Sequence, residues 1–240
     1  MSMEVLKSRL EVTLARQEML FRNIDCVDSG IRRLLKRWHI LPGVKLGDHL
    51  KSWDVLKTVN FLDERVSREG SVLDLGAYAS EILPVLHRLG FKTLTGIDLN
   101  PRLVDMPYRD AIHYMVGDIY STSLEDASFD ALTAVSVIEH GFDGARLLTE
   151  VSRLLKPGGY FVASVDYWPE KIDTSGIKAF GMDWMIFSRN ELAAFHDLAR
   201  EYGLDICGKT DFEAKQTTVK WLGRAYTFAW MAFKKADRIP

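Results

Sequence analysis

The sequence predicts an α/β protein. We expect a doubly wound, mostly parallel seven-stranded sheet with an antiparallel last strand, helices on both faces and an N-terminal helical extension. Short apolar runs alternate with helix-like segments from residue 71 onward, which is typical of parallel strands joined through helices. The first 65 residues instead show helix-like spacing of leucines. Near the end, two apolar runs follow one another with no clear helix between them, which favours an antiparallel last strand.

The composition is ordinary for a globular protein. The chain has 240 residues, 47% of them hydrophobic and 27% charged, which suits one compact domain with appendages. A formal net charge of −2 does not favour a nucleic acid or an anionic membrane as partner. No apolar run approaches the roughly 20 residues of a spanning helix, and the first residues do not resemble a secretory signal. Cys26 and Cys207 lack C-x-x-C spacing, so we expect a reducing, cytoplasmic setting.

Residues 1–65 are predicted to form the helical extension. Leu6, Leu10 and Leu14 recur four apart, and Met19, Leu20 and Phe21 add apolar content. The leucine row fits either a helix packed on the main domain or a helix that forms a homodimer. It spans too few heptads to indicate a coiled coil.

A local basic cluster lies between Gly30 and His39. It consists of Arg32, Arg33, Lys36 and Arg37, beside Leu34, Leu35 and Trp38. A solvated helix face explains such a cluster. Contact with a phosphate-bearing substrate or an anionic membrane surface is the functional alternative.

The elements after residue 70 follow from the apolar runs and from helix stop signals. We expect strands at residues 71–75, 94–98, 111–116, 129–137, 160–165, 204–208 and 226–233. We expect helices at residues 81–89, 144–155 and 191–202, which end at Gly90, at the K-P-G-G run and at Gly203.

Acidic residues stand where the first three of these strands end. In doubly wound sheets, ligands bind at the carboxyl ends of the strands. Asp74 is followed by Gly76, a glycine that lets the backbone turn and approach a ligand. Asp98 stands where an acid accepts hydrogen bonds from two ribose hydroxyls. Asp118 suits an exocyclic amine, with Ile119 beside an adenine face. These acids together indicate a nucleoside-bearing cofactor.

The start of the first of these helices also bears on the ligand. We expect Ser80 to cap this helix, with Glu81 in its first turn. A carboxylate there would repel a pyrophosphate, but it would tolerate a cofactor with a cationic centre.

Five motifs appear in a specific order: V-L-D-L-G, T-G-I-D-L-N, G-D-I-Y, F-D-A-L-T-A-V-S-V-I-E-H and L-L-K-P-G-G-Y-F-V-A-S-V. Together they resemble a class I (Rossmann-like) S-adenosylmethionine-dependent methyltransferase, from about residue 51 to the C-terminus. The resemblance implies a methyltransferase domain over residues 66–240 with S-adenosylmethionine as cofactor. By this resemblance, the methionine end of the cofactor is bound by Asp74, Gly76, Ala77 and Tyr78. The ribose is bound by Asp98 and Leu99, and the adenine by Asp118 and Ile119. Ser136 lies beside the cofactor, and residues 156–159 form the turn into the fifth strand.

The first motif departs from the family pattern Asp-x-Gly-x-Gly-x-Gly. Tyr78 and Ser80 replace the second and third glycines. A positive φ at Tyr78 would cost about 1 kcal/mol or more. Alternatively, the loop follows a different path and Tyr78 lies over or beside the cofactor. We expect binding to be retained, and the alternative is a catalytically silent binding or scaffold protein. A nicotinamide-linked oxidoreductase is disfavoured by the single loop glycine, Glu81 and Asp118.

Methyl transfer is an in-line displacement that needs a base only when the acceptor loses a proton. Three residues near the predicted site could supply one: His140, Asp143 and Asp166. We predict His140 and Asp166 as the catalytic residues. The alternative for His140 is a structural role at the end of the fourth strand.

The connection between the fifth strand and the next helix, residues 166–190, is long, as functional loops often are. It holds Tyr167, Trp168, Phe180, Trp184 and Phe187. Such rings suit a sugar or another polar ring-bearing acceptor, or they pack the insert on the sheet. The pattern F-G-x-D-W-x-I-F-S is similar to methyltransferases of polysaccharide and surface-glycan biosynthesis. We therefore expect a small-molecule or glycan-precursor acceptor.

Other partner classes find little support in the sequence. The six histidines have no H-x-x-x-H or H-E-x-x-H spacing, so we expect no metal site. The catalytic half lacks a basic stripe, which disfavours a nucleic-acid substrate.

Overall fold

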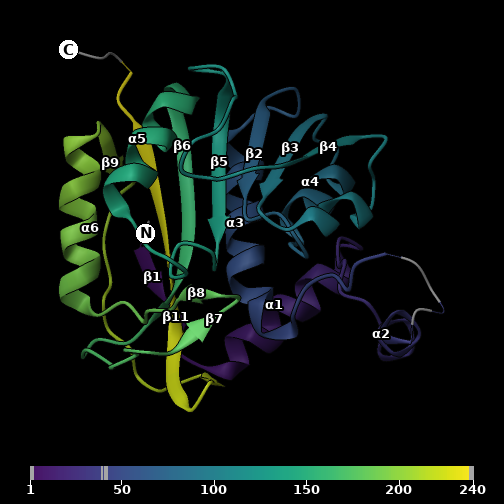
Figure 1. Ribbon diagram of the computed structural model, residues 1–240, viewed down its shortest axis with the longest axis horizontal. Coiled ribbons are helices and arrows are strands. Elements are labelled where there is room, and N and C mark those ends of the chain that lie inside the picture. The colour runs from purple at the N-terminus through teal and green to yellow at the C-terminus, as the bar shows by residue number, and fades with distance from the viewer. Residues whose placement is uncertain (1–2, 39, 41–42, 238–240) are drawn as a thin grey trace.

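A mixed central sheet organises the molecule. The computed structural model describes residues 3–38, 40 and 43–237, and in this part of the chain nine strands form the sheet. They are β1 (Met3–Val5), β2 (Ser71–Leu75), β3 (Thr93–Asp98), β4 (Ile112–Val116), β5 (Phe129–Val135), β6 (Leu155–Tyr167), β9 (Leu204–Ile206), β10 (Val219–Trp221) and β11 (Arg224–Lys235). The order is β1-β11-β6-β5-β2-β3-β4, and β9 and β10 also pair with β11 (Figure 1).

Strand directions agree with the predicted fold class. β2 pairs in parallel with β3 and β5, β3 with β4, and β5 with β6. β11 is antiparallel to β6 and β9, as the adjacent apolar runs near the end predicted. The seven predicted strands are all present. β1 and β10 are additional, and both pair with β11 in the antiparallel sense.

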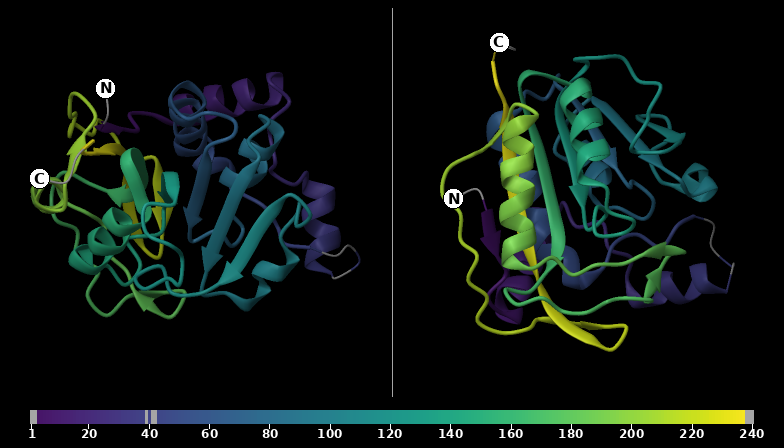
Figure 2. Two further views of the ribbon diagram at one scale, coloured as in Figure 1. Left: turned by 90° about the horizontal axis from the view of Figure 1, so that it is seen from above. Right: turned by 60° about the vertical axis from the view of Figure 1, so that its left-hand side comes forward.

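Helices cover both faces of the sheet (Figure 2). They are α1 (Arg9–Phe21), α2 (Gly30–Arg37), α3 (Ser52–Arg65), α4 (Ile82–Arg88), α5 (Gly144–Leu154) and α6 (Arg189–Glu201), with short 3-10 turns η1 (His49–Lys51) and η2 (Pro101–Asp105). A small hairpin, β7 (Lys178–Ala179) and β8 (Met182–Asp183), lies apart from the sheet.

Alternation along the strands divides the core into two layers. Val72 and Val162 pack with α1, α3 and α4, whereas their neighbours Leu73 and Phe161 pack with α5 and α6. Successive side chains of a strand point to opposite faces, so a strand covered on both sides is apolar throughout. This explains why these strands appear in the sequence as continuous apolar runs.

The N-terminal segment differs from the helical prediction. Its first described residues form strand β1, and Leu6 lies before α1 and is fully buried. Helix α1 buries Val12, Ala15 and Met19. Leu10 and Leu14 lie on the exposed side. The helix therefore packs on the domain through a different row of side chains from the leucine row.

The basic cluster falls largely outside what the structure describes. Helix α2 forms as the pattern indicated, but the side chains of Arg32, Arg33 and Arg37 are outside the described set. Lys36 donates to Asp28 Oδ2 and to the Val44 carbonyl, each at 2.7 Å. This lysine therefore has an internal structural role.

Three of the element boundaries that differ from the prediction have local reasons. Helix α4 begins at Ile82, whose N–H donates to Ser80 Oγ at 3.2 Å. Helix α6 begins at Arg189, because Ser188 and Glu191 form a reciprocal capping box. Strand β6 already begins at Leu155, so the K-P-G-G run lies inside the strand, with Gly158 at φ +77°.

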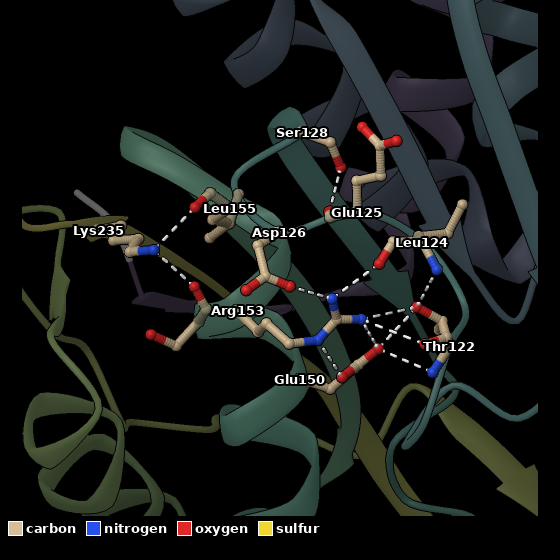
Figure 3. Close-up of polar contacts among 10 residues, drawn as sticks. Thr122, Leu124, Glu125, Asp126, Ser128, Glu150, Arg153, Leu155 and Lys235 are labelled. Carbon is tan, nitrogen blue, oxygen red and sulfur yellow. Dashed lines mark hydrogen bonds and ion pairs between the residues drawn. The ribbon is translucent and has the colours of Figure 1, made fainter.

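A cluster of polar contacts links helix α5 to the chain segment that follows β4 (Figure 3). Arg153 binds both carboxylate oxygens of the buried Glu150, at 2.7 and 3.0 Å. The same guanidinium donates to the Leu124 carbonyl at 2.7 Å, and Thr122 donates to Glu150 from its backbone and its hydroxyl. Lys235 donates to the Ser152 and Leu155 carbonyls at the end of α5. These contacts fix the chain that follows Asp118.

Candidate functional site

The three predicted acids lie at one edge of the sheet. Asp74 and Asp98 occupy the ends of the neighbouring strands β2 and β3, and Asp118 follows β4, the next strand of the sheet. The parallel pairing of β2, β3 and β4 brings these strand ends together, as the doubly wound reading required.

The loop after β2 follows a path that accommodates Tyr78. Gly76 has φ +77°, and a Cβ there would lie 2.4 Å from Val137 Cγ2. The non-glycine residue with positive φ in this loop is Ala79, at +63°. The suggested strain at Tyr78 is therefore absent, because the left-handed position falls one residue later.

Backbone donors of the loop hold Asp98. Tyr78 N–H donates to Asp98 Oδ2 at 3.0 Å, and Asn100 N–H donates to Oδ1 at 2.8 Å. Each carboxylate oxygen has a further lone pair for a ligand hydroxyl. Leu99 is 58% exposed beside it. The ribose assignment fits this geometry, since the carboxylate is oriented and half-buried.

Asp74 is buried beneath the loop. Thr133 Oγ1 donates to its Oδ1 at 2.6 Å, whereas the buried Oδ2 has no partner among the described residues. Burial raises the pKa of the Asp74 carboxyl to about 7. An unpartnered buried acceptor below the loop is suited to a donor group of a ligand.

Asp118 and Ile119 flank the outer part of this edge. Tyr120 N–H donates to Asp118 Oδ1 at 2.9 Å, and Arg146 lies 3.4 Å from Oδ2. Both Asp118 and Ile119 are partly exposed. The acid is positioned by its own turn and remains accessible.

A cavity of 320 Å³ lies at the ends of β5 and β6. It brings together three predicted residues, Ser136, His140 and Asp166. Ser136 directly follows β5, in a left-handed conformation with φ +53°. Since β5 is the neighbour of β2, this cavity adjoins the loop and strand ends described above.

Lys51, from η1 in the N-terminal segment, was not predicted as a site residue. Its ammonium donates to Ser136 Oγ and lies 3.9 Å from the centre of the Phe228 ring. Its charge also lowers the pKa values of Asp54, Glu139 and Asp166 against the larger effect of burial. No local motif marks Lys51, because the contact joins segments distant in sequence.

Three buried carboxyl groups interact electrostatically with this ammonium. Asp54, Glu139 and Asp166 are each 2% exposed or less. Ser164 Oγ donates to Asp54 at 2.8 Å and Trp184 Nε1 donates to Asp166 at 2.9 Å. Glu139 Oε2 is buried with no partner among the described residues. Burial, followed by the charge of Asp166, raises the pKa of Glu139.

The environment of His140 makes it a weak base. Burial, and then the charge of Lys51, lowers the pKa of His140 to about 4. Its Nδ1 is buried without a partner in the described part of the chain. The third suggested base, Asp143, caps α5 by accepting from Arg146 N–H at 3.1 Å.

The aromatic residues of the long connection divide between core and cavity. Tyr167, Trp184 and Phe187 are buried, and Trp168 is partly buried. Of the five, Phe180 lines the cavity, at the tip of the β7–β8 hairpin. The other rings of the cavity, Trp221, Tyr226 and Phe228, come from β10 and β11. The sequence reading did not include them as site residues.

Metal and membrane features give two negative findings. No group of three or more His, Cys, Asp or Glu side chains is placed to hold a metal ion within residues 3–38, 40 and 43–237. In the same part of the chain, no helix has the length and apolarity to cross a membrane.

Comparisons with known proteins agree with this arrangement. Residues 73–163 match the model of the methyltransferase domain family. A ubiquinone biosynthesis O-methyltransferase of Methylocella silvestris is 35% identical over 99 residues, which is 39% of this chain and 38% of that protein. The chain spans between 38% and 50% of the length of such curated relatives.

Solved structures share the fold at low sequence identity. The geranyl diphosphate C-methyltransferase of Streptomyces coelicolor is 18% identical with a TM-score of 0.57, covering 75% of this chain and 78% of that one. The [4+2]-cyclase SpnF is 15% identical with a TM-score of 0.58, covering 98% of both chains. Residues 73–163 are therefore similar to a methyltransferase domain, and the fold of the chain is that of the class I, S-adenosylmethionine-dependent methyltransferases.

Proposed function

We propose that the protein transfers a methyl group from S-adenosylmethionine to a small molecule or glycan precursor. One observation carries this proposal. Three oriented acids, Asp74, Asp98 and Asp118, line the ends of neighbouring parallel strands, next to a cavity at the ends of β5 and β6. The family match over residues 73–163 supports the same cofactor, as does the S-adenosylhomocysteine in the geranyl diphosphate C-methyltransferase structure.

Each part of the site has a defined role in this proposal. Asp98 holds the ribose hydroxyls, with Leu99 beside them. Asp118 and Ile119 hold the adenine. Asp74 and the backbone of residues 76–78 hold the methionine end, and Ser136 lies between cofactor and acceptor. The bound cofactor supplies an activated methyl group on a sulfonium, so the chain itself has to align the acceptor and exclude water.

The acceptor side of the proposal rests on the cavity. Phe180 and Trp221 are tilted by 31° with ring centres 5.9 Å apart, and they offer flat apolar faces at its mouth. Asp166 and Glu139 supply polar contacts at its floor. Rings with polar neighbours suit a sugar or another polar ring-bearing molecule.

We also propose self-association through α1. Leu10, Leu14 and Phe21 are 64%, 53% and 92% exposed, and their spacing places them on one side of the helix. Light scattering with size-exclusion chromatography should give a dimer for the wild type and a monomer for Leu14→Lys. A monomeric wild type would contradict this assembly. We also propose that the protein works in a reducing, cytoplasmic compartment, since Cys26 and Cys207 are both free thiols.

A second candidate function is a catalytically silent binding protein. Tyr78 and Ser80, which stand where the family has glycines, favour it. The cyclase SpnF shares the fold but is named for a different activity. Calorimetric titration separates the candidates. Micromolar binding of S-adenosylmethionine and S-adenosylhomocysteine, with none of NAD, supports the methyltransferase. Absence of binding to both sulfur ligands supports the silent protein, and binding of NAD alone supports an oxidoreductase.

A further inference from the structure

The cavity beside the predicted cofactor site combines buried acids with aromatic rings. We propose that the acceptor atom is an amine nitrogen, so that the methylated centre is a cation held by Glu139, Asp166 and the surrounding rings. This inference rests on the proposed methyl transfer and names the acceptor class for that site.

Charge at the cavity floor gives the first argument. Three acids line the cavity, Asp48, Glu139 and Asp166, against two lysines, Lys51 and Lys220. Glu139 Oε2 has no partner among the described residues, although it is fully enclosed. A buried carboxylate without a partner is costly, and a cationic ligand would relieve that cost. The site therefore has room for one more positive charge.

The ring arrangement gives the second argument. Phe180, Trp221, Tyr226 and Phe228 line the same cavity. Aromatic faces attract ammonium and methylammonium groups through the ring quadrupole. The Lys51 ammonium already lies 3.9 Å from the centre of the Phe228 ring, which shows that a cation fits against this wall.

Electrostatics distinguish nitrogen from oxygen acceptors. A hydroxyl acceptor gains negative charge as it loses its proton, and the neighbouring carboxylates oppose that change. An amine gains positive charge as the new bond forms, and the same carboxylates and rings stabilise it. One base would be enough for a hydroxyl, so the surplus of acids favours nitrogen.

The chemical step balances on this assignment. The acceptor reacts as the free amine R–NH2, so it passes no proton to Glu139, which stays available as a carboxylate. The nitrogen lone pair then forms the N–CH3 bond while the S–CH3 bond breaks, and that electron pair stays on sulfur. The products are R–NH2CH3⁺ and neutral S-adenosylhomocysteine, so the positive charge moves from sulfur to nitrogen.

Two probes of equal shape test the charge preference. Choline and 3,3-dimethyl-1-butanol differ in having a quaternary nitrogen or a quaternary carbon. NMR titration into the protein saturated with S-adenosylhomocysteine should give choline an affinity about tenfold higher or more. Glu139→Gln keeps the shape of the side chain and should remove most of that difference. Asp197→Asn, at an exposed position of α6, is the matched control and should retain it.

The outcomes distinguish a failure of the amine assignment from a failure of the proposed cofactor binding. Equal binding of the two probes, tighter binding of the alcohol, or binding of neither to the S-adenosylhomocysteine complex overturns the amine assignment while methyl transfer stands. Failure to bind S-adenosylhomocysteine overturns the proposed function itself. If Glu139→Gln fails to fold, Trp221→Leu at the cavity mouth provides a second variant, with the same expected loss of choline preference.

Discussion

The backbone N–H of Tyr78 donates to the carboxylate of Asp98 at 3.0 Å. The residue that replaces a family glycine thus uses its main chain to orient the acid assigned to the ribose. A hydrogen bond of this kind does not depend on the side chain at position 78. This explains how the loop keeps its connection to β3 after losing two glycines.

Substitution of Asp98 should test the cofactor assignment directly. Asp98→Ala removes the acceptor of two backbone N–H groups and the proposed ribose contact. We expect S-adenosylmethionine binding to weaken at least about a hundredfold in calorimetry, since charge-assisted hydrogen bonds are individually worth about 1.5–3 kcal/mol. Asp205→Ala, exposed on β9, is the control. Unchanged affinity in Asp98→Ala would show that the ribose assignment is wrong.

Two glycine substitutions in the loop should have opposite effects on stability. Ala79 has φ +63°, so Ala79→Gly relieves a left-handed alanine and should raise the free energy of unfolding by about 0.5–1 kcal/mol. Tyr78 has no such strain, and Tyr78→Gly should lower the free energy of unfolding, because packing is lost and the unfolded chain gains entropy. Urea denaturation of the two variants measures both. A stabilising effect of Tyr78→Gly would contradict the loop geometry.

Glu81 should make stability fall as pH rises. Burial raises the pKa of its carboxyl to about 8, so the folded chain retains a proton that the unfolded chain releases near pH 4. The favourable contribution is complete below about pH 4 and is lost progressively toward pH 8. Glu81→Gln should therefore raise the melting temperature above pH 8 and leave it nearly unchanged at pH 4. The exposed Glu201→Gln serves as control, and parallel pH profiles of wild type and Glu81→Gln would refute the prediction.

Arg153 should be important for stability. Its guanidinium binds Glu150 through two nitrogen atoms and also the Leu124 carbonyl. Arg153→Ala leaves a buried carboxylate poorly compensated, and we expect a loss of about 2–4 kcal/mol in the free energy of unfolding. Arg200→Ala on the exposed face of α6 should cost less than about 0.5 kcal/mol. Similar losses in the two variants would argue against a special role for this cluster.

Phe180 should lower the stability of the fold while contributing to ligand binding. It occupies the first position of a two-residue hairpin turn with φ +53°, followed by Gly181 at +82°. Asparagine is the favoured residue at such a position. Phe180→Asn should raise the melting temperature by a few degrees and weaken choline binding to the S-adenosylhomocysteine complex. An unchanged choline affinity would remove Phe180 from the acceptor site.

The sequence was sufficient to predict most of the sheet. Strands buried on both faces are continuous apolar runs bounded by glycines, and the acids that follow them stand at the same edge because the strands are parallel. The leucine row of α1 misled the packing prediction, because four-residue spacing identifies a helix but not which of its faces is buried.

The cavity at the ends of β5 and β6 was less accessible to sequence reasoning. Lys51 and Ser136 are far apart along the chain, and no local pattern joins them. Glu139 precedes His140 at the strand end, yet the sequence does not show which side chain carries the proton. That depends on burial and on the charge of Lys51. The positive φ at Ala79 likewise follows from the tertiary path of the loop.

The pairing of β1 with β11 has a consequence for synthesis on the ribosome. Met3–Val5 find their partners in Ala229–Met231, near the other end of the chain. Until β11 has emerged from the exit tunnel, the first strand has no place in the sheet. The cavity wall formed by Tyr226 and Phe228 is also missing until then. A nascent chain could thus complete β2, β3 and β4, which carry the proposed cofactor edge, before β11 and the cavity wall that it supplies have emerged.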